Sequence, residues 1–290
     1  FYMERICMYT GIVIVPKATL YENPTKETVS DELLSGWLVT VVQERGRTLK
    51  IITDYGYSGW INSQNIRRIS TETFHHWKET PSTAILCRKT TDLLKSPMVQ
   101  APVLSTLFMG SRVILCGNPQ DGWQKIRTAG GYCGYVPTLS LIAPPTPVPT
   151  TSGCLAPDVL SEDEWELRSC ILNYAMSFLG TQYRWGGKTI LGLDCSGFTF
   201  MCYYMCGIII YRDAMIKEDF PVHKISFSCI KPADLLYFPS HVAIYLGNGK
   251  YIHCTGNPNS FGCVINSLRP EDLDYRADLA ESLLAVGSVF

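Results

Sequence analysis

The chain has 290 residues, 46% of them apolar and 18% charged, and its formal net charge at pH 7 is −1. This length and apolar content allow two or three domains with packed cores, whereas the balanced charge argues against a nucleic-acid-binding surface. The longest apolar runs are too short to span a membrane, and no signal peptide or metal-binding pair of cysteines is visible.

The N-terminal half contains an internal repeat. LYENPT from residue 20 resembles LLKSPM from residue 93, and GYSGWINSQNI from residue 56 resembles GYCGYVPTLSL from residue 131. Both copies alternate short runs of β-branched and aromatic residues with Gly, Asn and Asp turns, which is typical of small all-β barrels. We therefore expect one domain at residues 1–72 and a second, similar domain at residues 80–143.

A proline-rich segment follows the repeats. Residues 144–153 read PPTPVPTTSG, which predicts an extended, semi-rigid linker. We place the linker at residues 144–157 and a third domain at residues 158–290.

The third domain begins with a change of hydrophobic period. Helical spacing of apolar residues predicts a helix with Ser161 as its N-cap, Glu164 as the capping-box partner and Gly180 near its C-terminal end. The apolar positions of this helix are Trp165, Leu167, Cys170, Ile171, Tyr174 and Phe178. A second helix is expected to begin near Cys195, and the later runs HVAIYL, GNG and KYIHC predict a β-hairpin. Helices followed by a hairpin indicate an α+β domain.

Cys195 differs from the other eleven cysteines because it falls in the first turn of a predicted helix, after a Gly-rich stretch. Free backbone N–H groups and the helix dipole are expected to lower the pKa of its thiol from about 8.5. Most of the remaining cysteines, including Cys202 and Cys206, are interpreted as small buried hydrophobic residues, and Cys254 as a core residue. So many thiols fit a reducing compartment, although a secreted protein of an anaerobe would show the same composition.

A nucleophilic thiol needs a base, and two of the five histidines, His241 and His253, fall on the predicted hairpin. A two-residue turn at Asn248-Gly249 would place His253 opposite Ile244 and the two imidazoles on opposite faces of the sheet. A three- or five-residue loop, or a bulge, would place both rings on one face, about 7–8 Å apart along the diagonal. Both registers are open at this point. The other histidines are expected to be solvated: His75, His76 and His223.

The segments YRWGG, LDCSGF, ADLLYF and HVAIYLGNGKYIH, in this order, resemble the NlpC family of bacterial cell-wall cysteine peptidases. The two repeats resemble the bacterial SH3-like domains that precede the catalytic domain in some members. The resemblance implies an α+β, papain-like catalytic domain at residues 158–290, preceded by two small all-β SH3-like barrels.

The resemblance also implies roles for individual residues. Cys195 would be the nucleophile, His241 the general base, and His253 the third member that orients His241. Tyr183, together with the backbone N–H of Cys195, would bind the oxyanion. Three further positions match residues that line the substrate cleft of the family: Trp185, Asp194 and Ser196.

Some three-domain members cut between γ-D-glutamyl and a diamino acid in cell-wall peptides that carry a free N-terminal L-alanine. By this resemblance, Glu22 and Tyr57 of the first copy would bind the amine of the substrate, with Asp31 as an alternative acid. The second copy keeps Tyr132 but has Lys95 where the first has Glu22, so only the first copy has the charge for this role.

Taken together, we expect a monomeric cysteine endopeptidase that acts on peptidoglycan-derived peptides through a thioacyl intermediate, with no metal and no cofactor. The bond would be the one between γ-D-glutamate and a diamino acid. Two alternatives are an amidase that cuts between muramic acid and L-alanine, and a cell-wall binding protein without activity. The sequence leaves open the preferred diamino acid and the location, which is either cytoplasmic, in the recycling of murein peptides, or the cell envelope after removal of a signal.

Overall fold

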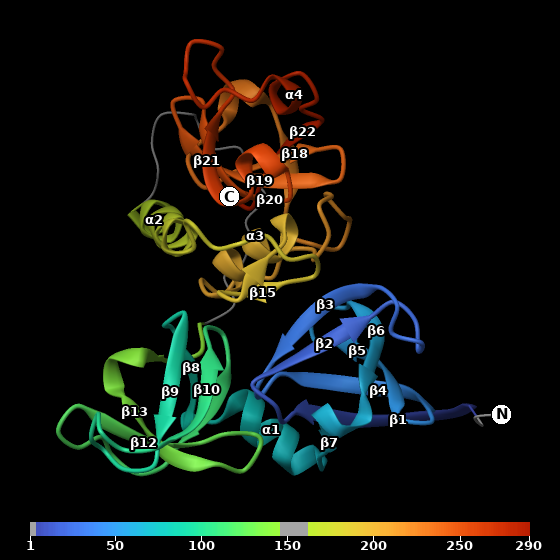
Figure 1. The fold of residues 1–290 in the computed structure, drawn as a ribbon, viewed down its shortest axis with the longest axis vertical. Coiled ribbons are helices and arrows are strands. Elements are labelled where there is room, and N and C mark those ends of the chain that lie inside the picture. Colours follow the sequence, from blue (N-terminus) through green and yellow to red (C-terminus); the bar gives the residue numbers. More distant parts are fainter. Residues whose placement is uncertain (1–3, 146–161) are drawn as a thin grey trace. The chain divides into compact units, whose positions relative to one another are not determined.

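The computed structural model describes residues 4–145 and 162–290, and the chain divides into two compact units, Phe1–Pro144 and Pro145–Phe290 (Figure 1). We call these unit 1 and unit 2 and describe each by itself. Most of the predicted linker and the predicted N-cap, Ser161, lie outside the described residues. The finer domain boundaries stay predictions.

Unit 1 begins with a seven-stranded antiparallel sheet in the order β3-β2-β6-β5-β4-β1-β7. Its strands are β1 (Glu4–Val13), β2 (Lys17–Tyr21), β3 (Val29–Leu34), β4 (Leu38–Arg45), β5 (Thr48–Thr53), β6 (Ser58–Asn62) and β7 (Ile66–Arg68). A short 3₁₀ turn, η1 (Ser63–Asn65), precedes β7, and the helix α1 (Thr71–Glu79) follows it.

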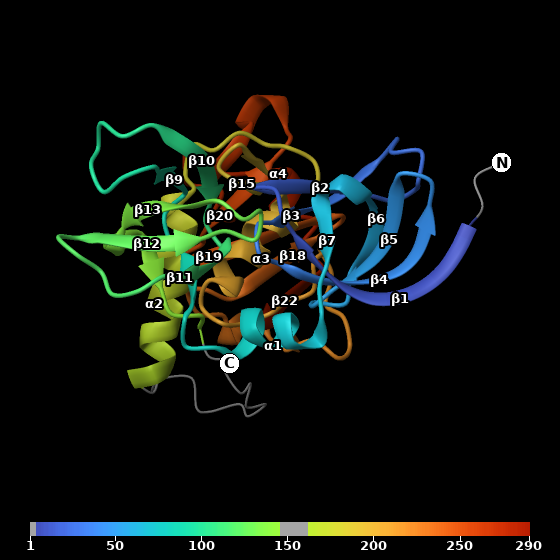
Figure 2. The same cartoon turned by 90° about the horizontal axis from the view of Figure 1, so that it is seen from below.

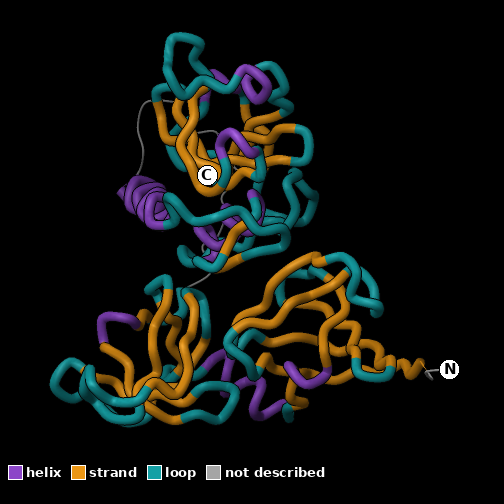
Figure 3. The backbone as a smooth tube through the Cα atoms, viewed as in Figure 1, coloured by secondary structure: helices purple, strands orange, loops and turns teal. Residues whose placement is uncertain are grey.

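The second sheet repeats the first, in the order β10-β9-β13-β12-β11-β8-β14. Its strands are β8 (Thr83–Leu86), β9 (Thr90–Leu94), β10 (Val103–Phe108), β11 (Arg112–Leu115), β12 (Trp123–Arg127), β13 (Cys133–Pro137) and β14 (Leu141–Ile142), with η2 (Thr138–Ser140) before the last. Adding seven to each strand number of the first order gives the second. The predicted all-β repeat is therefore confirmed, as two antiparallel sheets of identical topology (Figure 3).

The two sheets of unit 1 share apolar contacts. Trp77 of α1 is buried in one cluster with Ile12 from the first sheet and Ile114 from the second. The indole N–H of Trp37 also donates to the Gly110 carbonyl, at 2.9 Å. The helix thus fills the space between the repeats (Figures 1 and 2).

Unit 2 combines helices with a six-stranded antiparallel sheet in the order β17-β22-β18-β19-β20-β21. These strands are β17 (His223–Ile225), β18 (Leu235–Phe238), β19 (His241–Gly247), β20 (Lys250–Thr255), β21 (Gly262–Ser267) and β22 (Ala285–Ser288). The helices are α2 (Glu162–Ser177), α3 (Cys195–Tyr204) and α4 (Ala277–Ala280), and the minor elements are β15 (Lys188–Thr189), β16 (Gly192–Leu193), η3 (Phe227–Cys229) and η4 (Pro258–Ser260). The expected α+β architecture is confirmed.

The two predicted helices of unit 2 are present. Ile171 and Phe178 are buried, as their spacing predicted, and Gly180 follows the helix with a φ of +82°, a conformation that favours glycine. Trp165 does not belong to the buried stripe, because 61% of it is exposed. α3 begins at Cys195 and packs on β19 and β20, which fixes the position of its first turn relative to the hairpin. No helix among the described residues is long and apolar enough to cross a membrane.

Candidate active site

The hairpin of β19 and β20 brings the two candidate histidines onto one face of the sheet. Ile244 pairs with Ile252 and Tyr245 with Tyr251, whereas the next pair, Gly247 with Lys250, is shifted by one residue. The chain therefore makes the tight turn at Asn248-Gly249, where both residues have positive φ, and corrects the register with a bulge at Leu246. This is the bulge alternative of the sequence analysis.

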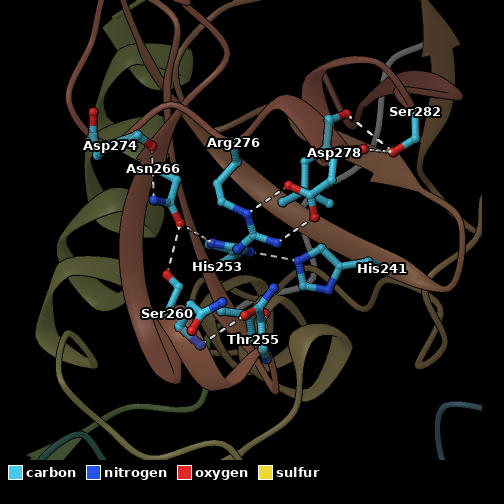
Figure 4. Close-up of polar contacts among 12 residues, drawn as sticks. His241, His253, Thr255, Ser260, Asn266, Asp274, Arg276, Asp278 and Ser282 are labelled. Carbon is cyan, nitrogen blue, oxygen red and sulfur yellow. Dashed lines mark hydrogen bonds and ion pairs between the residues drawn. The ribbon is translucent and has the colours of Figure 1, made fainter.

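The bulged register places the imidazoles in direct contact. Nε2 of His241 lies 2.7 Å from Nδ1 of His253, and the ring centroids are 4.9 Å apart at an interplanar angle of 80°. His253 is fully buried, and its Nε2 lies 2.9 Å from Oδ1 of Asn266 on β21. Figure 4 shows the three side chains in a row.

Asn266 determines which nitrogens of the pair carry protons. Its Nδ2 donates to the carbonyl of Asp274 at 2.9 Å, so its Oδ1 is the atom that faces His253. His253 must then donate from Nε2 and accept at Nδ1, and neutral His241 must donate from Nε2. The remaining nitrogen of His241, Nδ1, carries a lone pair and is the basic atom of the pair.

Both imidazoles are held in the neutral form. Burial lowers the pKa of His241 to about 3, with further lowering by the charges of His253 and Arg276. Burial likewise lowers the pKa of His253 to about 4, against the opposing effect of its bond to Asn266. Arg276 stands beside the pair and forms a two-pronged ion pair with Asp278, at 2.8 and 2.6 Å (Figure 4).

Cys195 occupies the first residue of α3, as predicted, and the backbone N–H groups of Val242 and Ser196 lie close enough to its sulfur to lower the pKa of the thiol. Val242 is the neighbour of His241 in β19, so the sulfur lies beside the strand that carries the candidate base. The structure thus brings His241 and His253 into contact and places Cys195 at the start of a helix that packs on the two strands that carry them. Their joint action as a catalytic triad stays a prediction.

The expected low pKa of the Cys195 thiol is wrong for the molecule without substrate. Burial and the Asp194 carboxylate raise this pKa to about 11, although the backbone N–H groups of Val242 and Ser196 and the charge of Arg212 lower it. The helix start does favour the thiolate, but the desolvation of a sulfur that is only 8% exposed outweighs it. The resting pair is accordingly a thiol and a neutral imidazole.

Asp194 organises the start of α3. It is the N-cap, and its carboxylate accepts from the backbone N–H groups of Gly197 (2.5 Å) and Gly186 (2.8 Å). Arg212, which is 1% exposed, donates to both carboxylate oxygens of Asp194 and to the hydroxyl of Ser196. Asp194 and Ser196 are therefore buried and engaged with internal partners, and their assignment to substrate binding stays a prediction.

The two aromatic candidates lie in different environments. Burial raises the pKa of the Tyr183 hydroxyl, and negative charge at Cys195 and Asp194 would raise it further, so this hydroxyl near Cys195 keeps its proton. Tyr183 also contacts Phe261 edge-on, with ring centroids 6.2 Å apart. Trp185 is 65% exposed, which excludes a packing role in the core of the unit.

The two candidates for binding a substrate amine belong to unit 1. Glu22 is exposed just after β2, Tyr57 is half-buried, and the alternative acid Asp31 is fully buried and accepts a hydrogen bond from Tyr55. The backbone N–H of Glu22 donates a hydrogen bond to the carbonyl of Thr28, and in the second repeat the backbone N–H of Lys95 donates to the carbonyl of Pro102. The two positions are therefore equivalent in the fold, while the role of Glu22 stays a prediction.

Three residues of the site were missed by the sequence analysis: Asn266, Arg276 and Arg212. Asn266 could have been flagged, because it lies two residues along β21 from Val264, the cross-strand partner of His253. The two arginines had no comparable signal, since each contact depends on a loop conformation. Within the described part of the chain, no cluster of three or more His, Cys, Asp or Glu side chains is arranged to hold a metal ion.

Cys254 is buried, as expected for a core residue, and its thiol donates to the Leu193 carbonyl at 3.0 Å.

Comparisons with known proteins agree with this geometry. The sequence profile of the NlpC/P60 family matches residues 180–269. Dipeptidyl-peptidase 6 of Lysinibacillus sphaericus is 33% identical over 289 residues, which cover 97% of this chain and 99% of that protein. Gamma-D-glutamyl-L-lysine dipeptidyl-peptidase of Bacillus cereus is 27% identical over 246 residues, covering 77% of this chain and 66% of that protein. The crystal structure of an NlpC/P60 family protein from Bacillus cereus superimposes with a TM-score of 0.73 at 19% identity, over 96% of this chain and 98% of that one.

Proposed function

The chain belongs to the NlpC/P60 family of peptidases, and from this premise we propose that it is a cysteine endopeptidase that hydrolyses the γ-D-glutamyl–diamino acid bond of murein peptides. The names of its relatives support this choice of bond: one acts, by its name, on γ-D-glutamyl-L-lysine, and the other is a dipeptidyl-peptidase matched over nearly its whole length. The observation that supports the proposal is the contact between His241 and His253 on strands against which the helix that begins at Cys195 packs.

In the proposed mechanism, Nδ1 of His241 removes the proton of Cys195 as the sulfur attacks the scissile carbonyl carbon. The thiol and the imidazole start neutral, so proton transfer accompanies attack and no thiolate–imidazolium pair is required beforehand. The negative charge that develops on the carbonyl oxygen is bound by the Tyr183 hydroxyl and the backbone N–H of Cys195.

Collapse of the tetrahedral intermediate breaks the C–N bond, and the imidazolium of His241 gives its proton to the leaving amine of the diamino acid. The acyl group remains on sulfur as a thioester. His241, neutral again, then takes a proton from the attacking water, and the γ-carboxylate of D-glutamate leaves as the Cys195 thiol is restored. Throughout, His253 accepts from Nε2 of His241 and keeps Nδ1 directed to the reaction.

We further propose that Trp185, Asp194 and Ser196 contribute to the substrate site, and that Glu22 and Tyr57 bind the free amine of the N-terminal L-alanine. If the ammonium group of the substrate were bound without a carboxylate partner, the binding free energy would be less favourable by a few kcal/mol, which lowers the affinity roughly a hundredfold. This requirement would direct the enzyme to released peptides with a free amine.

The test uses L-Ala-γ-D-Glu-L-Lys, the same peptide acetylated at its N-terminus, and an intact muramyl peptide, with products identified by mass spectrometry. We expect rapid release of L-Ala-γ-D-Glu and free lysine from the first peptide, release of lysine from the acetylated peptide that is roughly a hundredfold slower, and no product from either with Cys195→Ala. Cys229→Ala, at a half-buried cysteine outside the site, serves as the matched control. Cleavage between muramic acid and L-alanine would instead identify an amidase, and an unreactive wild-type chain that retains peptide would identify a binding protein.

A further inference from the structure

Two thiols of unit 2 that take no part in the proposed reaction lie against each other. Cys170 is in the middle of α2, and Cys206 is in the turn that ends α3. The thiol of Cys206 donates to the sulfur of Cys170, and the two sulfur atoms are 3.0 Å apart. This separation exceeds the length of a disulfide bond by only about 1 Å. Cys170 is half-buried and reachable from solvent, whereas Cys206 is buried.

We propose that Cys170 and Cys206 form a redox modification site, at which a low-molecular-weight disulfide such as oxidised glutathione converts the two thiols into an intramolecular disulfide between α2 and the end of α3. The site is independent of the proposed peptidase reaction. The exposure of the two residues assigns their roles: Cys170 meets the oxidant, and Cys206 resolves the mixed disulfide.

The chemistry balances as a thiol–disulfide exchange in two steps. The Cys170 thiolate attacks one sulfur of the small disulfide, breaks its S–S bond and releases one thiol after protonation. Cys206 then loses its proton to solvent and attacks the Cys170 sulfur, which displaces the second small thiol. The two protein thiols lose two electrons in total, and the small disulfide gains them.

The electrostatics of the pair favour this order of events over oxidation of Cys195. The hydrogen bond from Cys206 lowers the pKa of the Cys170 thiol to about 7, against the effect of burial, and raises that of Cys206. The pKa of Cys195 is raised by burial to about 11. At neutral pH, the Cys170 thiol is therefore more ionised than the Cys195 thiol, which is largely protonated.

The disulfide would join two positions that are 36 apart in the sequence, and the loop that it closes carries Tyr183 and Cys195. α2 and α3 already meet inside this loop, where the rings of Phe178 and Phe198 are in edge contact at 6.3 Å. Cys195 is the first residue of α3, and Cys206 follows its C-terminal end. The disulfide would therefore restrain the C-terminal end of the helix, at the opposite end from Cys195. Oxidation should stabilise the unit and leave the Cys195 environment unchanged.

The experiment treats the full chain at pH 7.5 with oxidised glutathione or with dithiothreitol, followed by alkylation, non-reducing peptide mass spectrometry and thermal melting. We expect a peptide that links Cys170 to Cys206, and a melting temperature on the order of 5–15 °C higher in the oxidised sample, reversed by dithiothreitol. Cys170→Ser and Cys206→Ser should abolish the shift, and Cys229→Ser should retain it.

These readouts do not depend on catalysis, so they separate this proposal from the proposed function, and a Cys195→Ala background excludes reactions of the nucleophile. Should Cys206→Ser fail to fold, Cys170→Ser and Cys170→Ala on the exposed side of the pair give the same information. A chain that keeps both thiols alkylatable after oxidation, or a melting shift that survives Cys170→Ser, would overturn the proposal.

Discussion

Nε2 of His241 lies 2.7 Å from Nδ1 of His253, and this contact exists only because a bulge at Leu246 offsets the register set by the tight turn that follows. Without the bulge the two rings would face opposite sides of the sheet. The buried amide of Asn266 continues the same line of hydrogen bonds to the carbonyl of Asp274. The positions of the protons on His241 and His253 are therefore set by the carbonyl of Asp274, acting through Asn266.

Asn266 is expected to act as a positioning residue. Asn266→Ala leaves the N–H of the buried His253 without an acceptor and frees the tautomer, which should lower kcat/KM by roughly 10–100-fold. Asn266→Asp keeps the shape and adds a negative charge that stabilises imidazolium, so the acid limb of the pH profile of kcat/KM should move to higher pH.

A purely structural residue would change the melting temperature without moving that limb. Asn259→Ala, at an exposed asparagine of the connection between β20 and β21, is the control and should leave the profile unchanged. An Asn266→Asp enzyme with the wild-type pH profile would contradict the role given to this residue.

The neutral histidine pair predicts that the folded state weakens in acid. An unfolded histidine has a pKa of about 6.5, whereas the folded values are about 3 for His241 and about 4 for His253. Below pH 6.5 the unfolded chain binds protons that the folded chain does not, so the free energy of unfolding falls as the pH falls. Each imidazole contributes up to about 1.4 kcal/mol per pH unit between pH 6.5 and its folded pKa.

Denaturant titrations at pH 7.0, 5.5 and 4.5 measure this slope. His253→Gln removes one of the two titrating groups, so its unfolding free energy should fall less steeply over the same range. Equal slopes in the two proteins would mean that His253 is not buried in the neutral form.

Arg212 is expected to support the nucleophile through Asp194. Arg212→Met leaves the buried Asp194 carboxylate without its cation at the cap of α3, which should cost about 3–5 kcal/mol of unfolding free energy. Arg269→Met, which removes an ion pair from a side chain that is 51% exposed, should change stability by no more than about 0.5 kcal/mol. Thermal melts of both variants give the comparison. Equal losses of stability would show that the buried ion pair of Arg212 with Asp194 contributes no more to stability than the exposed pair of Arg269.

The sequence predicted those features that local chemistry determines. The repeat, the helix start at Cys195 and the Asn248-Gly249 hairpin each carry a pattern within a few residues, and all three are present. The register of the hairpin could not be decided, because nothing in the sequence around Leu246 indicates whether this residue forms a bulge or continues a regular strand. The pKa of Cys195 was misjudged because helix geometry is visible in sequence and desolvation is not.

Trp185 offers a test of the substrate site that does not perturb the fold. Because 65% of this side chain is exposed, Trp185→Ala should leave the melting temperature nearly unchanged while raising KM roughly tenfold for the tripeptide. Trp165 on α2 is 61% exposed and is a matched control, so Trp165→Ala should alter neither quantity. Parallel kinetics of the two variants distinguish an aromatic surface that holds substrate from one that does not, and an unchanged KM in Trp185→Ala would remove this residue from the proposed site.

Glu22 provides the sharpest test of the requirement for a free amine. Glu22→Gln removes the carboxylate charge and keeps the size of the side chain, so kcat/KM for L-Ala-γ-D-Glu-L-Lys should fall by roughly 10–100-fold. Glu27→Gln, at an exposed acid of the same connection between β2 and β3, should have no effect. The acetylated tripeptide has no ammonium group, so its slow hydrolysis should be equal in wild type and Glu22→Gln. A loss of the same size on both peptides would mean that Glu22 acts on the fold of unit 1 and not on the charge of the substrate.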